Sequence, residues 1–501
     1  MKILGFYIGG HDSNVSLADT NGSVKYYKLE RITQSKHKKG NLQWVKDVCE
    51  ENHFIPDYVC FSDGNRNNLG ICEEGILWQE CEPFCIFPDA KTFCIDHHYA
   101  HILSAFPVVN DDIGVGVCVD GRGDHQVKCS VISTPFNVYK SKIIYSGKED
   151  SFCLMFNKIG KLMGLSGGEL DFAGKIMGAH AYGNVEYEFV SEIEEYALKY
   201  GIDETLQMNY KGKKIEDICK KMDQRFFDWL ATYHYWVGSR IFNIIYNTVD
   251  QKVPIVYSGG GAQNTVYNNY MSGYFDMKIP PHCYDGGISL GCIKFLGEYT
   301  GINISIDEFP FCQGDEDLGY ASEAIIDKVT KLLAQGKIVG WCQGKSEIGP
   351  RALGHRSILM DPSIKDGKDI MNQRIKKREK WRPFAASILK QDVEKIIGRN
   401  MSLDYMLHAV EVLQEHREKF CSVTHVDGTC RFQTVENTRE LHTFYQLIKK
   451  FKDETGVYGI LNTSYNSSGM PIANSKKDVL KAFEILDLDA VCIGNELIIR
   501  K

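Results

Sequence analysis

The stretch that decides the fold is Ile3-Leu-Gly-Phe-Tyr-Ile8, followed by Gly9-Gly-His-Asp-Ser-Asn14 and a second apolar run at positions 15–18. Two apolar runs joined by a turn of glycine and small polar residues predict a β-hairpin, and a further strand is expected at 24–29. The pattern returns where residues 115–119 lead into Asp120-Gly-Arg-Gly-Asp-His125 and out along 127–133. A hairpin that occurs twice predicts a duplicated α/β core, although turns of this composition also recur by chance.

Length and composition indicate a two-domain globular protein. The chain has 501 residues, of which 43% are hydrophobic and 25% are charged. It lacks an apolar run of about 18 residues, so no membrane span is expected, and the N-terminus reads as a strand instead of a signal peptide. The net charge of −7 argues against broad nucleic-acid binding, and the 17 scattered cysteines without a CxxC pair indicate reduced thiols in the cytoplasm.

The middle of the chain predicts a nucleotide or phosphate cradle. Residues 225–250 are apolar at helical spacing, and a strand at 254–257 then enters Ser258-Gly-Gly-Gly-Ala-Gln-Asn264. A strand, a glycine turn and a helix form a phosphate cradle at a cleft, with Gly259 and Gly260 in the turn, although glycines also make simple tight turns. The acidic loop at 301–319 predicts the boundary between domains 1–310 and 311–501.

A metal site is predicted near residue 100. His97 and His101 are spaced i and i+4, which places both imidazoles on one face of a helix. Asp120 and Asp285, each at a glycine-rich strand end, are the candidate carboxylate ligands. Two histidines and two carboxylates suit iron(II), manganese or zinc, while the alternative is a pair of structural histidines.

An anion site is predicted at Ser346-Glu-Ile-Gly-Pro-Arg-Ala-Leu-Gly-His-Arg-Ser357. Glycines let backbone N–H groups approach a phosphate, and Arg351 and Arg356 can each grip phosphate oxygens in a bidentate manner. Taken alone, the stretch is equally consistent with a salt-bridged surface loop.

Further basic and small polar residues follow in the last third of the chain. Lys376, Arg378 and Arg382 precede an apolar strand at 385–389, and Arg431 comes later. Leu461-Asn-Thr-Ser-Tyr-Asn466 adds amide and hydroxyl donors. Together they predict a site for a doubly charged phosphate beside ATP, and a basic surface with an unrelated turn is the alternative.

Seven motifs occur in a fixed order, and as a set they resemble the O-carbamoyltransferases of the NodU and antibiotic-tailoring type over essentially the whole chain. The motifs are His97-x3-His101, Gly174-Lys-Ile-Met-Gly178, Ser258-Gly-Gly-Gly-Ala-x-Asn264, Gly349-Pro-Arg-Ala-Leu-Gly354, Arg382-Pro-Phe384, His425-Val-Asp-Gly-Thr429 and Leu461-Asn-Thr-Ser464.

The resemblance implies a fold and a reaction. It implies a duplicated actin-like, ribonuclease-H-like domain over 1–310 and an α/β domain similar to YrdC over 311–501. The C-terminal domain is expected to make carbamoyl adenylate from carbamoyl phosphate and Mg-ATP. The N-terminal domain is expected to pass the carbamoyl group to an acceptor hydroxyl, which makes the protein an ATP-dependent carbamoyltransferase.

The resemblance also implies roles for residues. His97, His101, Asp120 and Asp285 would hold Fe(II) or another divalent metal. His11, supported by Asp12, would activate the acceptor hydroxyl. The remaining positions fall into three groups: Lys175 and Asn264 at the adenylate; Arg351, His355 and Arg356 at the ATP phosphates; and Lys376, Arg382, Arg431, Asn462, Thr463 and Ser464 at carbamoyl phosphate.

The acceptor and the assembly state stay open. His180 stands where relatives usually carry a small or apolar residue, and the compact middle region does not fix an acceptor. A sugar or natural-product hydroxyl is expected, a hydroxymethyl pyrimidine in DNA is an alternative, and a homodimer is possible. The rival classes are a non-catalytic ATP-binding regulatory protein and a metal-dependent hydrolase or sugar kinase, but neither accounts for all the motifs.

Overall fold

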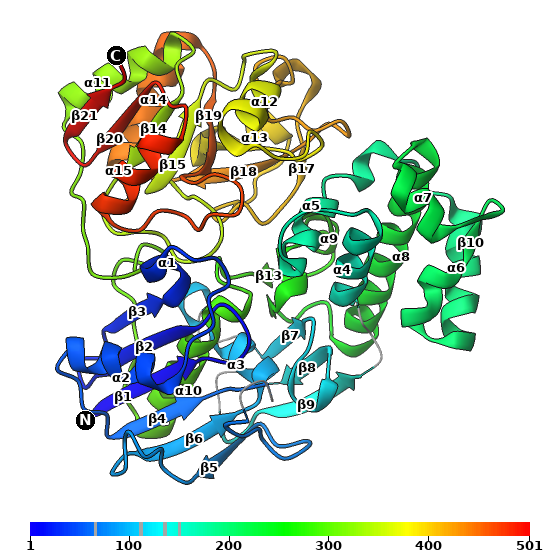
Figure 1. Ribbon diagram of the computed structural model, residues 1–501, viewed down its shortest axis with the longest axis vertical. Helices are drawn as coiled ribbons and strands as arrows, with labels where there is room; N and C mark the ends of the chain where they lie inside the picture. The colour runs from blue at the N-terminus through cyan, green and yellow to red at the C-terminus, as the bar shows by residue number, and fades with distance from the viewer. Residues whose placement is uncertain (65–67, 110–113, 134–137, 149–151) are drawn as a thin grey trace. The chain divides into compact units, whose positions relative to one another are not determined.

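The computed structural model describes residues 1–64, 68–109, 114–133, 138–148 and 152–501 (Figure 1). The chain is a mixed α/β protein, as the sequence predicted. Contacts between Cα atoms divide it into two compact units. Unit 1 comprises Met1–Gly10, Ala18–Gly22 and Asn41–Ile304, and unit 2 comprises His11–Leu17, Ser23–Gly40 and Ser305–Lys501. The domain boundary between residues 310 and 311 stays a prediction.

Two sheets in the first 280 residues repeat one strand order. The first has the order β3-β2-β1-β4-β6-β5 and the second β13-β12-β7-β8-β9. In each, three consecutive strands are neighbours and the first of them pairs in parallel with a later strand, β1 with β4 and β7 with β12. This is the duplication that the two hairpins predicted. The strands are β1 (Lys2–Tyr7), β2 (Asn14–Asp19), β3 (Val24–Lys28), β4 (Tyr58–Phe61), β5 (Trp78–Cys81), β6 (Lys91–Ile95), β7 (Val115–Val119), β8 (Cys129–Ser133), β9 (Lys142–Gly147), β12 (Ile255–Ser258) and β13 (Met277–Lys278).

The helices of unit 1 include the long apolar helix that the sequence predicted at 225–250. This helix, α8, buries Trp229, Tyr233 and Trp236 on its inner side. The described helices of this unit are α2 (Leu42–Glu51), α3 (His97–Leu103), α4 (Phe152–Leu162), α5 (Phe172–Ile176), α6 (Tyr187–Tyr200), α7 (Ile215–Lys221), α8 (Gln224–Thr248), α9 (Thr265–Met271) and α10 (Ile288–Thr300), beside the strand pair β10 (Asn209–Tyr210) and β11 (Lys213–Lys214).

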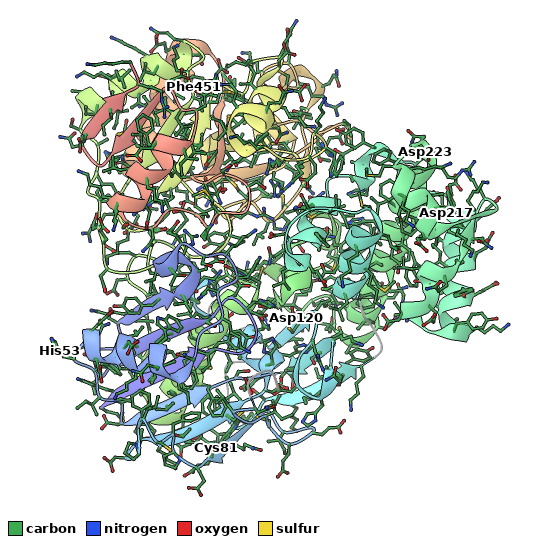
Figure 2. The ribbon with its side chains drawn as sticks, viewed as in Figure 1. His53, Cys81, Asp120, Asp217, Asp223 and Phe451 are labelled. Atoms are coloured by element: carbon green, nitrogen blue, oxygen red, sulfur yellow. The ribbon has the colours of Figure 1, made fainter. Side chains whose placement is uncertain are left out.

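Unit 2 is built on an eight-stranded sheet of order β17-β18-β16-β19-β15-β14-β20-β21. Apolar side chains of α11 and α14 pack on one face, among them Phe451 (Figure 2), and those of α13 and α15 pack on the other. The elements are β14 (Val339–Cys342), β15 (Arg356–Met360), β16 (Ala385–Leu389), β17 (Val410–Glu411), β18 (Thr429–Val435), β19 (Gly459–Ser464), β20 (Ala490–Ile493) and β21 (Glu496–Ile499), with α1 (Leu29–Thr33), α11 (Glu323–Ala334), α12 (Gly367–Ile370), α13 (Val393–Ile397), α14 (His442–Thr455), α15 (Lys476–Ile485) and a π-helix, η8 (Met371–Lys376).

Several sequence predictions are confirmed at the level of elements. The strands at 115–119 and 385–389 have the predicted bounds. The 17 cysteines are free thiols, and most are buried. None of the described helices combines the length and hydropathy that crossing a bilayer requires.

The packing of α10 against α3 depends on the absence of a side chain at Gly291. A Cβ at this position would lie 2.0 Å from the carbonyl oxygen of Ala100 in α3. Because that oxygen belongs to a helix backbone, it cannot move aside without moving the helix. The close approach therefore fixes α3, the helix that carries His97 and His101.

We expect Gly291→Ala to lower the free energy of unfolding by about 3 kcal/mol, because the two helices must separate to admit the methyl group. Urea unfolding followed by circular dichroism measures the change. Gly174→Ala is the matched control, since a Cβ there meets nothing within 4 Å and the residue lies within α5. The control should be neutral or slightly stabilising, and equal stability of both variants would contradict the packing argument.

Candidate functional site

The predicted metal ligands come together in unit 1. Asp96 caps the N-terminus of α3 by accepting a hydrogen bond from Tyr99 N at 2.9 Å, and the helix then presents His97 and His101 from one face. Asp120 follows the end of β7 (Figure 2), and Asp285 opens the turn before α10. Two elements that are far apart in sequence thus supply one carboxylate each.

The four ligand atoms are spaced for a shared cation. His97 Nε2 lies 3.5 Å from Asp120 Oδ2 and 3.6 Å from Asp285 Oδ1, and the corresponding distances from His101 Nε2 are 3.9 and 3.4 Å. Metal–ligand bonds of about 2.1 Å in a tetrahedron separate their ligand atoms by about 3.4 Å. The four side chains are buried, and the ring nitrogens of both histidines have no hydrogen-bond partner among the residues that the structure describes. This arrangement fits a divalent metal ion.

Outer contacts orient both carboxylates. Tyr7 OH donates to Asp285 Oδ2 at 2.8 Å, and Gly260 N donates to Asp120 Oδ1 at 2.8 Å. Each carboxylate therefore has one oxygen held by a donor and the other directed at the histidines, as is usual for metal-binding carboxylates. Burial opposes charge on His97, but Asp120 and Asp285 outweigh it and raise the pKa of the imidazole to about 10. The carboxylate pair thus stabilises positive charge between its members.

The residues predicted at the adenylate have other partners in this structure. The N–H of Gly260 is used by Asp120, and Gly259 adopts φ +87° beside the carbonyl of Val119. Asn264 caps α9 by accepting from Val266 N and Tyr267 N, and its amide nitrogen contacts His234 Nε2 at 3.0 Å. Lys175 donates to the carbonyl of Ser166. Their contacts with a nucleotide stay predictions.

The unusual His180 lies in the same unit. Its ring stacks on that of His234, with centroids 4.1 Å apart and the planes 5° from parallel. Burial and the neighbouring His180 hold the pKa of His234 well below its ordinary value. The residue that the sequence singled out therefore stacks on a histidine that contacts Asn264.

His11 and Asp12 belong to a larger polar cluster in unit 2. Asp12 Oδ2 lies 2.7 Å from His11 Nδ1 and 3.2 Å from His37 Nδ1, and Asp12 Oδ1 lies 2.7 Å from Lys28 Nζ. Lys28 also pairs with Glu30 at 2.8 Å. Burial disfavours the Asp12 carboxylate, but Lys28 and the two histidines together hold its pKa well below the ordinary value. Asp12 is therefore a carboxylate that orients the imidazoles.

Sequence reasoning found only two members of this cluster. His37 lies in a basic stretch that resembles a solvated surface. Lys28 is the last residue of a strand, and Glu30 lies in the short helix that follows. The sequence offered one signal, because His37 follows Glu30 by only 7 residues. In the structure, Glu30 Oε2 accepts a hydrogen bond from His37 N at 3.0 Å. Both Asp12 and His37 also have positive φ, of 58° and 54°, which is unusual for residues other than glycine.

The loop at 346–357 folds its polar side chains inward. Glu347 Oε1 accepts from Leu353 N at 2.8 Å and Arg356 N at 3.1 Å. Each guanidinium nitrogen of Arg356 donates to backbone carbonyls, at Gln343, Gly344, His355 and Asn474. These bonds order the loop in this structure, and the contact of Arg356 with the ATP phosphates stays a prediction.

His355 is held in the same way. Its ring stacks on Phe311 with centroids 3.6 Å apart, and its nitrogens contact the carbonyls of Lys345 and Glu440 at 2.7 and 3.0 Å. Burial lowers the pKa of His355 although Glu347 opposes the shift. The contact between His355 and the ATP phosphates stays a prediction, and Arg351 is the loop residue that joins the cations described next.

Five cations gather in unit 2. Burial is the largest cause that lowers the pKa values of Lys376 and Arg431. Neighbouring positive charges lower them further: Arg378 and Arg382 act on Lys376, and Arg351 and Arg382 act on Arg431. The pKa of Arg431 is thereby lowered to about 9. We call Arg351, Lys376, Arg378, Arg382 and Arg431 the cationic cluster.

One carboxylate lies at the cationic cluster: Glu379 Oε2 is 3.8 Å from Arg382 Nη1. Among the described residues, Lys376 Nζ donates to neutral oxygens, the carbonyls of Ser464 and Asn466 at 2.5 and 2.9 Å and their side chains at 3.2 and 2.9 Å. Arg431 Nε is buried and has no hydrogen-bond partner in the described part of the chain. A buried excess of positive charge of this kind is the expected state of a site for a polyanion.

The predicted residues of β19 lie beside this cluster. Ser464 contacts Lys376 directly, and Thr463 is its half-buried neighbour on the strand. Asn462 is buried and donates to Ala352 O, Ser387 Oγ and Gln433 Oε1 at 2.9 to 3.2 Å. Asn462 thus ties β19 to β16 and β18, which positions the two hydroxyl residues.

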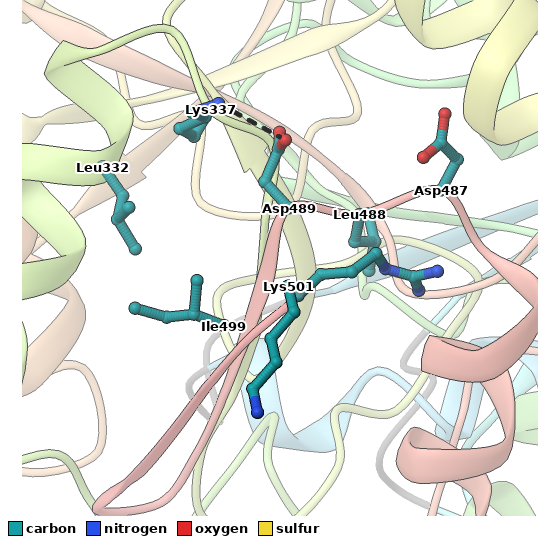
Figure 3. A pocket seen from close by; sticks show the side chains of 8 residues that line it. Leu332, Lys337, Asp487, Leu488, Asp489, Ile499 and Lys501 are labelled. Atoms are coloured by element: carbon teal, nitrogen blue, oxygen red, sulfur yellow. Dashed lines mark ion pairs between the residues drawn. The ribbon is translucent and has the colours of Figure 1, made fainter.

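A separate shallow pocket lies at the edge of the same sheet (Figure 3). It is lined by Leu332, Lys337, Asp487, Leu488, Asp489, Ile499, Arg500 and Lys501, and Lys337 Nζ lies 3.8 Å from Asp489 Oδ1 across it. None of the predicted site residues lines this pocket. The cationic cluster and the metal-type cluster are therefore the candidate functional sites.

Comparison with known proteins shows what the chain is similar to. Residues 330–500 match the family described as Carbamoyltransferase C-terminus. Nodulation protein NolNO of Sinorhizobium fredii is 27% identical over 436 residues, covering 81% of this chain and 63% of the relative, so the chain spans less than two thirds of that protein's length. The 3'-hydroxymethylcephem-O-carbamoyltransferase of Amycolatopsis lactamdurans is 24% identical, with 97% of both chains covered.

A solved structure of full-length HypF in its phosphate- and nucleotide-bound form covers 61% of this chain and 47% of that chain at 15% identity, with a TM-score of 0.33, a likeness too low to support an argument. The described residues thus combine an α/β fold with a metal-type cluster and a buried cluster of cations. Residues 330–500 match a carbamoyltransferase C-terminal family, and one of the relatives to which the chain is similar is named as an O-carbamoyltransferase.

We expect the protein to bind a divalent metal and Tyr7→Phe to weaken that binding about tenfold, because the Asp285 carboxylate loses its orienting donor. Calorimetric titration with Fe(II) under anaerobic conditions, or with Zn(II), measures the affinity. Tyr257→Phe is the matched control, since Tyr257 OH is buried in the same unit without a hydrogen-bond partner. Equal metal affinity of the two variants would remove Tyr7 from the outer shell.

Proposed function

We propose that the chain is an ATP-dependent O-carbamoyltransferase. Its C-terminal part would form carbamoyl adenylate from carbamoyl phosphate and ATP, and its N-terminal part would transfer the carbamoyl group to a hydroxyl. The cationic cluster is the observation that carries the proposal, because it brings a buried lysine, Lys376, close enough to Arg378 and Arg382 for their charges to act on it, and two phosphate-bearing substrates carry charge of the opposite sign. An actin-like fold for the N-terminal part and a YrdC-like fold for the C-terminal part belong to the same proposal.

The first half-reaction balances with one water. Water cleaves carbamoyl phosphate to carbamate and phosphate, and a carbamate oxygen then attacks the α-phosphorus of ATP and displaces pyrophosphate. Negative charge accumulates on phosphate oxygens in each step, so fixed cations lower both barriers. Lys376, Arg382 and Arg431 supply these cations without rearrangement, because backbone and side-chain oxygens of Ser464 and Asn466 already hold the Lys376 ammonium.

The second half-reaction needs a proton acceptor. The acceptor hydroxyl attacks the carbamoyl carbon of the adenylate, the bond to the AMP phosphate breaks, and the hydroxyl proton must leave. With Nδ1–H of His11 donating to Asp12 at 2.7 Å, His11 Nε2 carries the lone pair that accepts this proton. Asp12 fixes the tautomer and stabilises the imidazolium that results, and Lys28 keeps Asp12 ionised.

The four buried residues of unit 1 complete the proposal. His97, His101, Asp120 and Asp285 would hold the divalent metal, which we propose to be Fe(II). When bound, such an ion supplies Lewis-acid polarisation of an acyl oxygen. Tyr7 and Gly260 keep the two carboxylates in place.

We propose a small-molecule hydroxyl as the acceptor. The relative from Amycolatopsis is named for a hydroxymethyl group on a cephem, and the relative from Sinorhizobium is named as a nodulation protein. The hydroxymethyl group in the first of these names agrees with the acceptor class that the sequence resemblance implies, a hydroxyl of a sugar or natural product.

We expect Lys376→Met to lower carbamoyl-phosphate-dependent pyrophosphate release from ATP about a thousandfold, because developing charge on phosphate loses its buried cation. The assay needs no acceptor. Lys419→Met is the matched control: Lys419 also donates to a backbone carbonyl, that of Gly456 at 2.8 Å, but is exposed. Full release by Lys376→Met, or none by wild-type protein supplied with magnesium and Fe(II), would contradict the proposal.

His97→Ala should impair carbamoyl transfer and leave pyrophosphate release intact. Pyrophosphate release should stay near the wild-type rate, whereas carbamoyl transfer to a hydroxymethyl acceptor, detected by mass spectrometry, should fall at least about a hundredfold, since the Lewis acid is lost. Lys376→Met serves as the reciprocal control. Equal loss of both activities in His97→Ala would mean that the metal-type cluster is not specific to the transfer step.

A further inference from the structure

Arg31 is a buried guanidinium that no predicted role includes. It lies in α1 with 2% of its surface exposed. Its Nη2 donates to Gly349 O at 2.8 Å and Glu347 O at 3.4 Å, and its Nη1 donates to Ser346 Oγ at 3.3 Å and Ile472 O at 3.4 Å. All four acceptors belong to two loops of unit 2, and three of them lie at the start of the loop at 346–357.

The contacts of Arg31 in the described chain are with neutral oxygens. A guanidinium that is buried against carbonyls fixes the positions of those carbonyls, because its planar fork of donors binds several acceptors at once and a lysine ammonium has no such fork. The charge adds to the positive field, and Arg31 contributes to the lowered pKa of the buried Arg356, after the larger effect of burial. The arrangement is therefore retained at an electrostatic cost.

The shortest bond reaches the point where the loop turns. Gly349 has φ +92°, a conformation that residues with a side chain rarely adopt, and its carbonyl is directed to Arg31. Pro350 follows with a φ fixed by its ring, and Arg351 comes next. A stiff two-residue connection thus links the oxygen held by Arg31 to the guanidinium that enters the cationic cluster.

The residue before Arg31 faces the other cluster of unit 2. Glu30 binds Lys28 Nζ at 2.8 Å and His37 N at 3.0 Å, and Lys28 in turn pairs with Asp12. A helix of five residues, Leu29–Thr33, therefore contacts the histidine cluster through Glu30 and the anion loop through Arg31. The contacts of two adjacent residues in this short element therefore oppose displacement of Arg31.

We infer that Arg31 is a positioning residue: by holding the carbonyls at 347–349 it sets Arg351 in the cationic cluster and thereby determines the affinity of that cluster for phosphate. The inference deepens the proposed function, on which it rests for the identity of the anion. Arg31 itself touches no substrate in this scheme. Its effect passes through Arg351.

A double-mutant cycle on the full-length chain tests this path, with inorganic phosphate as the probe and calorimetric titration as the readout. Arg31→Met and Arg351→Met should each weaken phosphate binding about tenfold, as expected for loss of one charge-assisted contact. If Arg31 acts through Arg351, the double variant should be weakened about tenfold as well. Independent effects would multiply to about a hundredfold, and that result, or wild-type affinity in Arg31→Met, would overturn the inference.

Arg500→Met is the matched control. Arg500 also donates to backbone carbonyls in unit 2, those of Phe483 and Leu486, and it lines the pocket of Figure 3. The phosphate affinity of the Arg500→Met variant should equal that of the wild-type protein. If Arg31→Met does not fold, Arg31→Lys replaces it in the cycle: it keeps the charge but not the fork, so phosphate binding should still weaken, and wild-type affinity would overturn the inference.

The outcomes separate this inference from the proposed function. One outcome is that the double variant binds phosphate about as weakly as each single variant, while the protein releases no pyrophosphate from ATP and carbamoyl phosphate. This outcome would support the role of Arg31 and refute the proposed reaction. A wild-type chain that binds no phosphate would overturn the role of Arg31 together with the cationic cluster.

Discussion

Buried charge is the constraint on which both sites depend. In unit 1, two carboxylates face two imidazoles at 3.4 to 3.9 Å, so positive charge between them is favoured. In unit 2 the sign is reversed, because Lys376 and Arg431 are buried beside further guanidinium groups and few carboxylates. Taking ions out of water is costly unless opposite charge accompanies them. Each arrangement is thus organised around a ligand of the missing sign.

The surrounding fold supplies the rigidity that such arrangements require. Helix α3 is fixed by its cap at Asp96 and by the absence of a side chain at Gly291. In unit 2, Asn462 binds three acceptors beneath the anion site, and Arg356 binds carbonyls from two loops. These groups are polar and buried, so their geometry is set by directional bonds in addition to apolar packing.

The sequence predicted elements and ligand types better than it predicted partners. The spacing of His97 and His101 gave the shared helix face because helical geometry is local. The orientation of Arg356 was not predictable, because a glycine-rich loop with arginines has the same composition whether its guanidinium groups bind phosphate or backbone carbonyls. Lys28 and His37 were missed for a related reason, since a charged residue near a basic run resembles a solvated one until the fold encloses it.

The π-helix that ends at Lys376 makes the length of this segment part of the site. A π-turn holds one more residue than an α-turn, because its hydrogen bonds join residues i and i+5 instead of i and i+4. Loss of a single residue between Met371 and Lys376 would leave an ordinary helical turn and alter the path by which the backbone reaches the lysine. Segment length here is therefore as informative as residue identity when related sequences are compared.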